Sequence, residues 1–288
     1  MGSAFSSLKF YFKSVVFGVL ISVCALYGVV ASIFLRIIGK PQFAQYTVAR
    51  AFYYSFSTIL GVKINIKNGH YLNEKPAIVI SNHQSALDIL ILGKTFTPGM
   101  TVTAKKALKF VPFLGWFMLA SGTFFLDRSR GEKARKVLDG ALASLKRDNR
   151  ALFMFPEGTR SGTTKLDLLP FKKGAFHLAK QAQIPIVPFV VSNTSDIFHA
   201  SSRTFNRGEI TIEVLPPMST SHLENNEQLN DFVLEVHDKM KTTLQNLGYS
   251  KVPGLKKEET AVEPLDTENN EEVAIERVPE HTPLLSKD

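Results

Sequence analysis

The chain has 288 residues, enough for one domain with a sizeable core and for extensions at its ends. Its single cysteine, Cys24, excludes an intramolecular disulfide and a cysteine-based zinc site, and we interpret it as a small hydrophobe. Residues 251–288 hold ten acidic and five basic residues, a net charge of −5, so residues 1–250 carry +13 of the total of +8. This excess suits an anionic partner: nucleic acid, a negatively charged membrane or a phosphate-bearing substrate.

The first predicted element is an uncharged run of 22 residues, 14–35. A helix needs about 20 apolar residues to cross the hydrocarbon core, so the run is long enough to span a membrane. A cleaved signal peptide is the competing interpretation, and the length of the run counts against it. The lysines and arginines that flank the run favour a cytosolic position for the rest of the chain only weakly.

A second apolar and aromatic stretch, residues 46–62, is interrupted by Arg50 and several hydroxyl groups. This composition predicts an interfacial helix rather than a second span. A helical hairpin of the two stretches, lying partly in one leaflet, is the alternative. We assign residues 1–61 to a membrane anchor.

From residue 62 onward, short apolar strands alternate with amphipathic helices. Apolar and polar residues alternate over residues 62–66, and short apolar runs predict strands at Ala77–Ile80, Leu152–Phe155 and Ile186–Val191. Apolar residues at i, i+3 and i+4 predict helices over residues 134–145, 175–182 and 229–240. The fold class is therefore α/β, a layered sheet flanked by helices, over residues 62–250, with an N-terminal membrane-embedded helical segment.

Residues 110–126 are also uncharged, and a second span is conceivable there. Pro112, Gly115 and Gly122 interrupt this stretch, so we predict a buried or membrane-dipping helix followed by a strand. Residues 251–288 are acidic and lack periodicity, which predicts a disordered tail. In that tail, Glu280 with Leu284 and Leu285 resembles an acidic dileucine sorting signal, a pattern that also arises by chance.

The strand that ends near Ser81 leads directly into the segment NHQSALD, residues 82–88. Ser85 and Asp88 predict a capping box at the start of a helix, Ala86–Leu92. Two residues five apart on one helix diverge by about 140°, but His83 precedes the helix, so its ring can fold back onto Asp88. Such a pair would make the free ring nitrogen a better base. The alternative is that Asp88 only caps the helix and His83 only satisfies a buried backbone group.

A base at His83 would have to act directly on a substrate hydroxyl, because the sequence has no G-x-S-x-G nucleophile and no nearby cysteine. This implies a ternary complex without a covalent enzyme intermediate. No metal is predicted, since His-x4-Asp is not a familiar ligand spacing and no second cluster supplies further ligands.

Cations follow three predicted strands: Lys105, Arg128 and Arg160. Strand ends are where α/β sheets hold ligands, and Gly158 would let the backbone approach a ligand closely. Arg160 offers a bidentate fork for a phosphate, so the three cations could converge on one dianionic group. Each could instead be a solvated surface charge, and we keep that interpretation for Lys106, Lys172 and Lys173. Nucleic acid is not predicted, because no nucleic-acid-binding motif accompanies the basic residues.

Four segments in this order resemble the glycerolipid acyltransferase family, in particular its fungal 1-acylglycerol-3-phosphate acyltransferases. They are NHQSALD (82–88), GTFFLDR (122–128), FPEGTRS with LPFKKGA (155–161 and 169–175), and IPIVP (184–188). Each segment alone is modest evidence, and the four together in the right order are highly specific. The motifs extend over residues 77–195.

The resemblance implies that His83 takes the proton of the sn-2 hydroxyl of 1-acylglycerol 3-phosphate, which attacks the thioester of acyl-CoA. Asp88 would orient His83, and the product would be phosphatidic acid for phospholipid biosynthesis. The implied glycerol phosphate site comprises Gly122, Arg128, Glu157, Gly158, Thr159 and Arg160, with Lys105 close by. The fourth motif is tied to acyl-donor binding or packing, and we interpret its prolines as structural.

The implied partners are lysophosphatidic acid, acyl-CoA as co-substrate and membrane lipids, with no cofactor, metal or nucleic acid. Glycerol 3-phosphate or a lysophospholipid with a larger head group is the nearest alternative acceptor, and an inactive membrane-binding scaffold is the alternative from another class. We expect the endoplasmic reticulum membrane, or lipid droplets, with the catalytic domain facing the cytosol. Asn193-Thr194-Ser195 is a glycosylation sequon, and a glycan there would contradict the cytosolic placement.

Overall fold

The computed structural model describes residues 2–126, 140 and 142–255. Several predicted features lie outside these residues: Arg128, most of the helix predicted over residues 134–145, the tail from residue 256 and its dileucine pattern. Lys251 exchanges two backbone hydrogen bonds with Glu209, so residue 251 still belongs to the folded unit.

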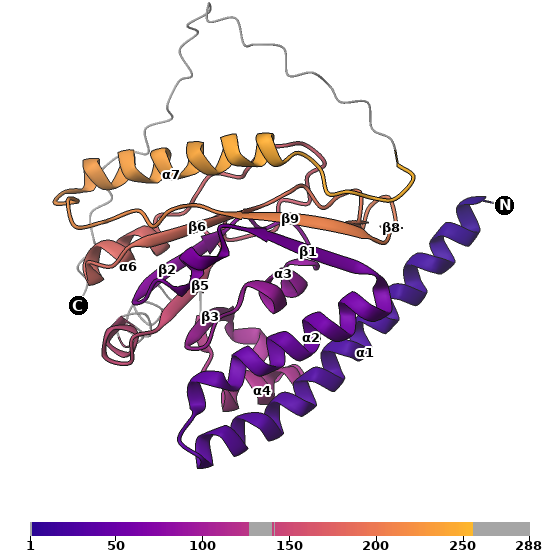
Figure 1. The fold of residues 1–288 in the computed structure, drawn as a ribbon, viewed down its shortest axis with the longest axis horizontal. Coiled ribbons are helices and arrows are strands. Elements are labelled where there is room, and N and C mark those ends of the chain that lie inside the picture. The colour runs from indigo at the N-terminus through magenta and orange to yellow at the C-terminus, as the bar shows by residue number, and fades with distance from the viewer. Residues whose placement is uncertain (1, 127–139, 141, 256–288) are drawn as a thin grey trace, which may run out of the picture. The chain divides into compact units, whose positions relative to one another are not determined.

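A sheet of seven strands forms the centre of the fold, in the order β1-β9-β6-β2-β5-β3-β4 (Figure 1). Neighbouring strands are parallel except β6 and β9, which are antiparallel. The bounds are β1 Val62–Lys67, β2 Ala77–Ser81, β3 Met100–Lys105, β4 Phe124–Leu126, β5 Ala151–Met154, β6 Ile186–Val191 and β9 Gly208–Val214; β7 Phe198–His199 and β8 Thr204–Phe205 form a separate ribbon. The α/β prediction and its four strands are confirmed, although β5 ends one residue before Phe155.

Helices cover both faces of the sheet, as Figure 1 shows. The bounds are α1 Gly2–Ile37, α2 Ala44–Leu60, α3 Asp88–Thr95, α4 Leu114–Ala120, α6 Gly174–Ala182 and α7 Asn226–Leu247, with 3-10 turns η1 Pro41–Phe43, η2 Gly69–Asn73 and η3 Lys106–Phe110. The predicted apolar faces of α6 and α7 are buried. A capping box between Asn225 and Gln228 begins α7.

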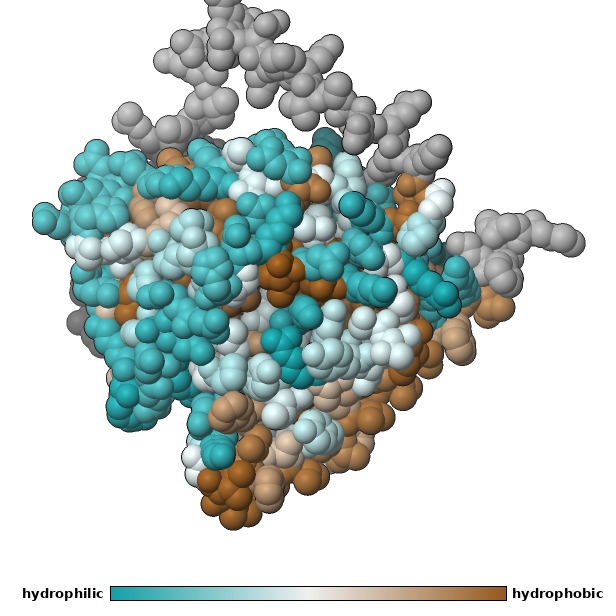
Figure 2. All heavy atoms as spheres, in the orientation of Figure 1, coloured by the Kyte–Doolittle hydropathy of each residue, from teal (hydrophilic) through white to brown (hydrophobic). Residues whose placement is uncertain are grey.

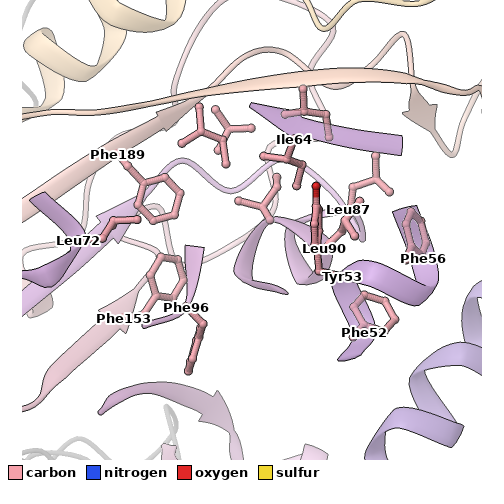
Figure 3. Packing of buried hydrophobic residues seen from close by; sticks show 14 of the residues in the cluster. Phe52, Tyr53, Phe56, Ile64, Leu72, Leu87, Leu90, Phe96, Phe153 and Phe189 are labelled. Atoms are coloured by element: carbon pink, nitrogen blue, oxygen red, sulfur yellow. The ribbon is translucent and has the colours of Figure 1, made fainter. Parts of the chain in front are cut away.

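The central strand β2 is buried along its whole length because its side chains serve two cores. Ile78 and Ile80 point to the core under α6 and α7. Ala77 and Val79 point to the other core, which also contains α2 and α3. Figure 3 shows that second core, where the rings of Phe153 and Phe189 stack next to Leu72.

The long helix α1 runs antiparallel to α2, to which η1 joins it, so the two form a helical hairpin (Figure 1). Within the described residues, Ser7–Ile37 is the one stretch of helix long and apolar enough to cross a membrane. One face of α1 packs on the domain: the ring of Phe17 meets those of Phe52 and Phe56 on α2 edge-to-face. The opposite face exposes a row of large apolar side chains, visible as the brown edge in Figure 2.

Residues 110–126 form the predicted helix and strand, α4 and β4. The helix is only partly buried: Gly115 and Met118 are buried, whereas Trp116 and Leu119 are exposed. Phe110 and Phe113, which precede the helix, are exposed as well, so the alternative of a buried helix is wrong. An apolar run has the same composition in a protein core and at a lipid surface, so the sequence did not distinguish these two environments.

Candidate active site

His83 lies in the turn that follows β2, and its ring folds back onto the first residue of α3. Its Nδ1 is 2.5 Å from Oδ2 of Asp88, and its ring stacks on that of Phe155 with centroids 3.8 Å apart. The carboxylate accepts the Nδ1 proton, which leaves a lone pair on Nε2. Nε2 forms no hydrogen bond to any described residue. The predicted pairing is thus present, with Nδ1 of His83 facing the carboxylate and Nε2 left for a substrate.

Asp88 is 3% exposed and holds the whole turn as well as the ring. The same Oδ2 accepts the backbone N–H groups of Gln84 at 2.8 Å and Ser85 at 3.0 Å. These bonds direct the amides of the turn to the carboxylate, so α3 begins at Asp88 and not at the predicted Ala86. Only half of the predicted capping box forms, because the Ser85 hydroxyl accepts from the Leu87 amide. Asp88 therefore caps the turn and orients His83 at the same time.

Glu157 is 2% exposed and binds the turn that carries His83. Its Oε1 accepts the backbone N–H of His83 at 2.6 Å, and its Oε2 accepts that of Leu169 at 3.2 Å. Burial raises the pKa of this carboxyl, and the two N–H groups offset part of that effect. Both oxygens are thus directed to the backbone, and Glu157 does not line the cavity described below.

The loop that carries Arg160 is hydrogen-bonded to the turn that carries His83. Ser161 N donates to His83 O at 2.8 Å, and Gly162 N donates to the carbonyl of Gln84 at 3.1 Å. The loop turns at Gly158, whose φ is +71°, a conformation that favours glycine. A Cβ at Gly158 would also be only 2.9 Å from Nζ of Lys172. Arg160 and His83 are therefore held at a fixed separation.

One cavity of about 860 Å³ connects these residues with the N-terminal helices. Residues at or after the ends of β2, β3 and β5 contribute His83, Lys105, Gly158, Thr159 and Arg160 to its wall, and the start of α3 contributes Asp88. The helices contribute apolar side chains, among them Ile21, Val48, Phe52, Ile89, Leu92 and Phe117. Of the predicted site residues that the structure describes, Gly122 and Glu157 do not line the cavity.

Lys172 was predicted to be a solvated surface charge; it is exposed, as predicted, and it also lines the cavity. Its backbone N–H donates to Pro156 O at 2.8 Å, which joins the two halves of the third motif. The only sequence feature that could have placed Lys172 at the cavity was its position in the motif LPFKKGA. The spacing of the strands does not predict where a residue in the long loop after β5 will lie. Lys173, its neighbour, does not line the cavity.

The side chains of Asn82 and Gln84 connect the turn that carries His83 to the end of β6, a role that sequence reasoning missed. The Asn82 amide donates to Val191 O at 3.0 Å, and its Oδ1 accepts from Val191 N at 2.9 Å. Gln84 donates to the carbonyl of Val191 and accepts from Thr194 N at 2.8 Å. These side chains continue the strand pairing beyond the point where β2 ends, so the turn cannot move independently of the sheet.

Asn193, the sequon residue, is 2% exposed. Its Nδ2 donates to the carbonyls of Thr163 at 3.3 Å and Lys165 at 2.9 Å, which fixes the loop after Arg160. The folded chain cannot present this side chain for glycosylation on either side of a membrane.

Replacing Asn193 with aspartate is expected to destabilise the protein by about 1–3 kcal/mol, because a carboxylate oxygen would face two carbonyl oxygens. The midpoint of thermal unfolding in detergent measures the effect. Asn225→Asp is the matched control: there the side-chain oxygen accepts an N–H at a helix N-cap, and aspartate serves equally well. Equal midpoints for the two variants would contradict the role assigned to Asn193.

Comparisons with known proteins agree with this geometry. Residues 63–192 match the family model described as Acyltransferase. The chain is 48% identical to the 1-acyl-sn-glycerol-3-phosphate acyltransferase of Saccharomyces cerevisiae, over 86% of this chain and 82% of that one. It is 36% identical to 1-acyl-sn-glycerol-3-phosphate acyltransferase beta of Homo sapiens, over 69% and 70% of the two chains. The crystal structure of the 1-acyl-sn-glycerophosphate (LPA) acyltransferase from Thermotoga maritima has the same fold, with a TM-score of 0.65, 23% identity, and coverage of 84% of this chain and 96% of that one. The resemblance of the four motifs is thereby confirmed: the chain belongs to the acyltransferase family.

Proposed function

We propose that the chain transfers an acyl group from acyl-CoA to the sn-2 hydroxyl of 1-acylglycerol 3-phosphate, giving phosphatidic acid. The observation that carries the proposal is the cavity. It is lined by the hydrogen-bonded pair His83–Asp88, by cations and by the apolar side chains of the helices. A phosphate-bearing lipid has the same combination of charge and apolar chain. The printed names of the relatives from yeast and human support the same acceptor.

In the proposed reaction, Nε2 of His83 takes the proton of the acceptor hydroxyl while the oxygen attacks the thioester carbonyl. The new C–O ester bond forms as the C–S bond breaks, and the imidazolium returns the proton to the leaving thiolate of CoA. Asp88 keeps the Nδ1 proton in place throughout. Acyl-CoA enters as a co-substrate, and the proposed steps need no cofactor or metal.

Three cations of the cavity wall, Lys105, Arg160 and Lys172, are proposed to bind the acceptor phosphate. Arginine can bind two phosphate oxygens at once, and a lysine adds a mobile charge. The predicted contribution of Arg128 lies outside the described residues and stays a prediction.

Lys172→Gln is expected to raise KM for lysophosphatidic acid by about tenfold to a hundredfold, because a charge-assisted contact to the phosphate is lost. Lys173→Gln removes the same charge from the adjacent residue, which does not line the cavity, and serves as the matched control. Initial rates of CoA release at varied acceptor concentration give both constants. A similar rise of KM in both variants would show that only the general charge of this surface matters.

The contacts at the two ends of α1 favour the hairpin alternative over a transmembrane span. Lys13 Nζ donates to Phe205 O, and Arg36 Nη2 donates to Ala120 O. These two residues are about 35 Å apart along the helix, and the hydrocarbon core is about 30 Å thick. A spanning α1 would therefore pull the domain itself through the bilayer. We propose that α1 and α2 lie in one leaflet on the cytosolic face of the endoplasmic reticulum membrane.

The test is to incubate membranes bearing the full chain with acyl-CoA and a panel of acceptors, and to follow free CoA. Lysophosphatidic acid should support the fastest release. Faster release with glycerol 3-phosphate or with a lysophospholipid of larger head group would refute the acceptor assignment. No release with any acceptor would favour the inactive scaffold.

A further inference from the structure

The segment Lys106–Ala120, here called the η3–α4 hairpin, exposes several large apolar side chains close together in the sequence. Phe110 is 76% exposed and Trp116 is 55% exposed, and Val111, Phe113 and Leu119 are exposed beside them. Exposed apolar residues that occur singly are common, but contiguous ones mark an interaction surface. None of these five residues lines the catalytic cavity.

The tip of the hairpin has a fixed shape. Phe113 has φ 61° and ψ −55°, and Leu114 N donates to Pro112 O at 2.6 Å, so residues 112–114 form a strained γ-turn. Gly115 lets the two limbs meet, since a Cβ there would collide with the carbonyl of Lys109. A non-glycine residue is held in such a conformation only when the surroundings enforce it. The apolar tip is therefore presented outward by the fold.

The charged residues in the sequence from 89 to 126 are all lysines. Lys105 and Lys109 are exposed at its base, and no acidic residue occurs between Asp88 and Asp127. An apolar tip with lysines at its base matches the layers of a membrane surface, where anionic head groups border the acyl chains. A partner protein with an acidic rim would meet the same charges but would not require so many exposed rings.

The hairpin also continues the apolar face of α1. Helix α4 lies against α1, where a side chain at Gly28 would collide with the ring of Phe117. Near this contact α1 exposes Ile33, Phe34 and Ile37 to the same surroundings as the hairpin. The inner side of the hairpin lines the cavity through Leu108, Leu114, Phe117 and Met118. The side chains of the hairpin thus separate the cavity from whatever covers the outer side of the hairpin.

We propose that the η3–α4 hairpin inserts into the same lipid leaflet as α1, with Phe110, Phe113 and Trp116 among the acyl chains and Lys109 at the head groups. In this position it forms the wall between the catalytic cavity and the leaflet. The insertion does not depend on which acyl acceptor the site uses, and its test needs no substrate.

Trp116 is the only tryptophan of the chain, so its fluorescence reports on the hairpin without any substitution. The full-length protein is reconstituted in vesicles of phosphatidylcholine and phosphatidylserine, with and without bromine on the acyl chains. Brominated chains should quench Trp116 strongly, and aqueous iodide should not. Quenching by iodide but not by bromolipid would overturn the proposal. Shielding from both quenchers would overturn it as well, because a second copy of the chain would then cover the hairpin.

A double variant, Phe110→Ser with Phe113→Ser, keeps Trp116 and removes two rings from the tip. It should lose most of the bromolipid quenching and gain quenching by iodide. Leu234→Ser is the matched control: Leu234 is an equally exposed apolar residue on α7, on the opposite face of the sheet, and Trp116 should be unaffected. Unchanged bromolipid quenching in the double variant, with an unchanged unfolding midpoint, would reject the proposed insertion.

Discussion

Replacing His83 with alanine is expected to lower kcat for acyl transfer by about 10²–10⁴-fold, the usual contribution of a positioned general base. His83 lines the cavity, and Asp88 orients its ring through Nδ1. Nε2 is therefore the nitrogen that can accept the proton of the acceptor hydroxyl. KM for lysophosphatidic acid should change little, because the proposed phosphate contacts come from Lys105, Arg160 and Lys172. Free CoA released from acyl-CoA by purified, reconstituted enzyme is the measurement.

Two variants complete this experiment. His70→Ala removes an exposed histidine outside the cavity and should leave the rate unchanged. Asp88→Asn should lower kcat nearly as much as His83→Ala. The asparagine amide would favour the wrong tautomer of His83, and it would weaken the hydrogen bonds to the backbone amides of the turn. If His83→Ala releases CoA as fast as the wild type with every acceptor, the proposed mechanism is wrong.

Glu157→Gln is expected to lower kcat strongly without raising KM for lysophosphatidic acid. Both carboxylate oxygens accept backbone N–H groups, and the amide of glutamine would turn an N–H₂ towards one of them. The unmade hydrogen bond costs about 1–3 kcal/mol and displaces His83, whose own amide is one of the two donors. Glu157 would then be a positioning residue, whereas a ligand of the glycerol phosphate would affect KM.

Steady-state constants for Glu157→Gln and for Glu209→Gln, an exposed glutamate on β9, decide between these roles. Only the first variant should lose kcat. A rise in KM with unchanged kcat would support the substrate contact that the family resemblance implies, and would contradict the positioning role.

The pH dependence of stability gives an independent signature of Glu157. Burial raises the pKa of its carboxyl in the folded state, so the folded protein binds this proton more tightly than the unfolded chain does. The stabilisation is complete below the ordinary pKa of glutamate and is lost as the pH rises through the raised folded-state pKa. Thermal midpoints over a pH series should show this decline in the wild type, and Glu157→Gln should lack it. An identical pH profile in both proteins would show that Glu157 is not the group responsible.

Much of the fold could be predicted because periodicity and burial are local properties. Val62, Ile64 and Ile66 alternate in β1, and Leu229 to Met240 follow one face of α7, as the spacing predicted. The start of α3 was predicted two residues too early, because the amides before Asp88 bind its carboxylate rather than helix carbonyls. The exposed position of Trp116 could not be predicted from an apolar run that a core helix would share.

The candidate site was predictable only where its parts are close in the sequence. His83 and Asp88 are five residues apart, so turn and helix geometry were sufficient to bring them together. Glu157 is 74 residues from the backbone N–H that it accepts. Asn193 reaches Lys165 across 28 residues. Such contacts depend on the order of strands in the sheet, which single-sequence spacing does not contain.

Helix α1, the predicted membrane anchor, also forms part of the candidate active site. Ile21, Cys24 and Ala25 of α1 line the cavity, and Phe17 covers the rings of Phe52 and Phe56. A chain shortened at its N-terminus to make it water-soluble would lack one side of the cavity and expose aromatic rings of α2 to solvent. Purification and inhibitor screening therefore require the intact chain in detergent or lipid, since a truncated form would present a different binding site.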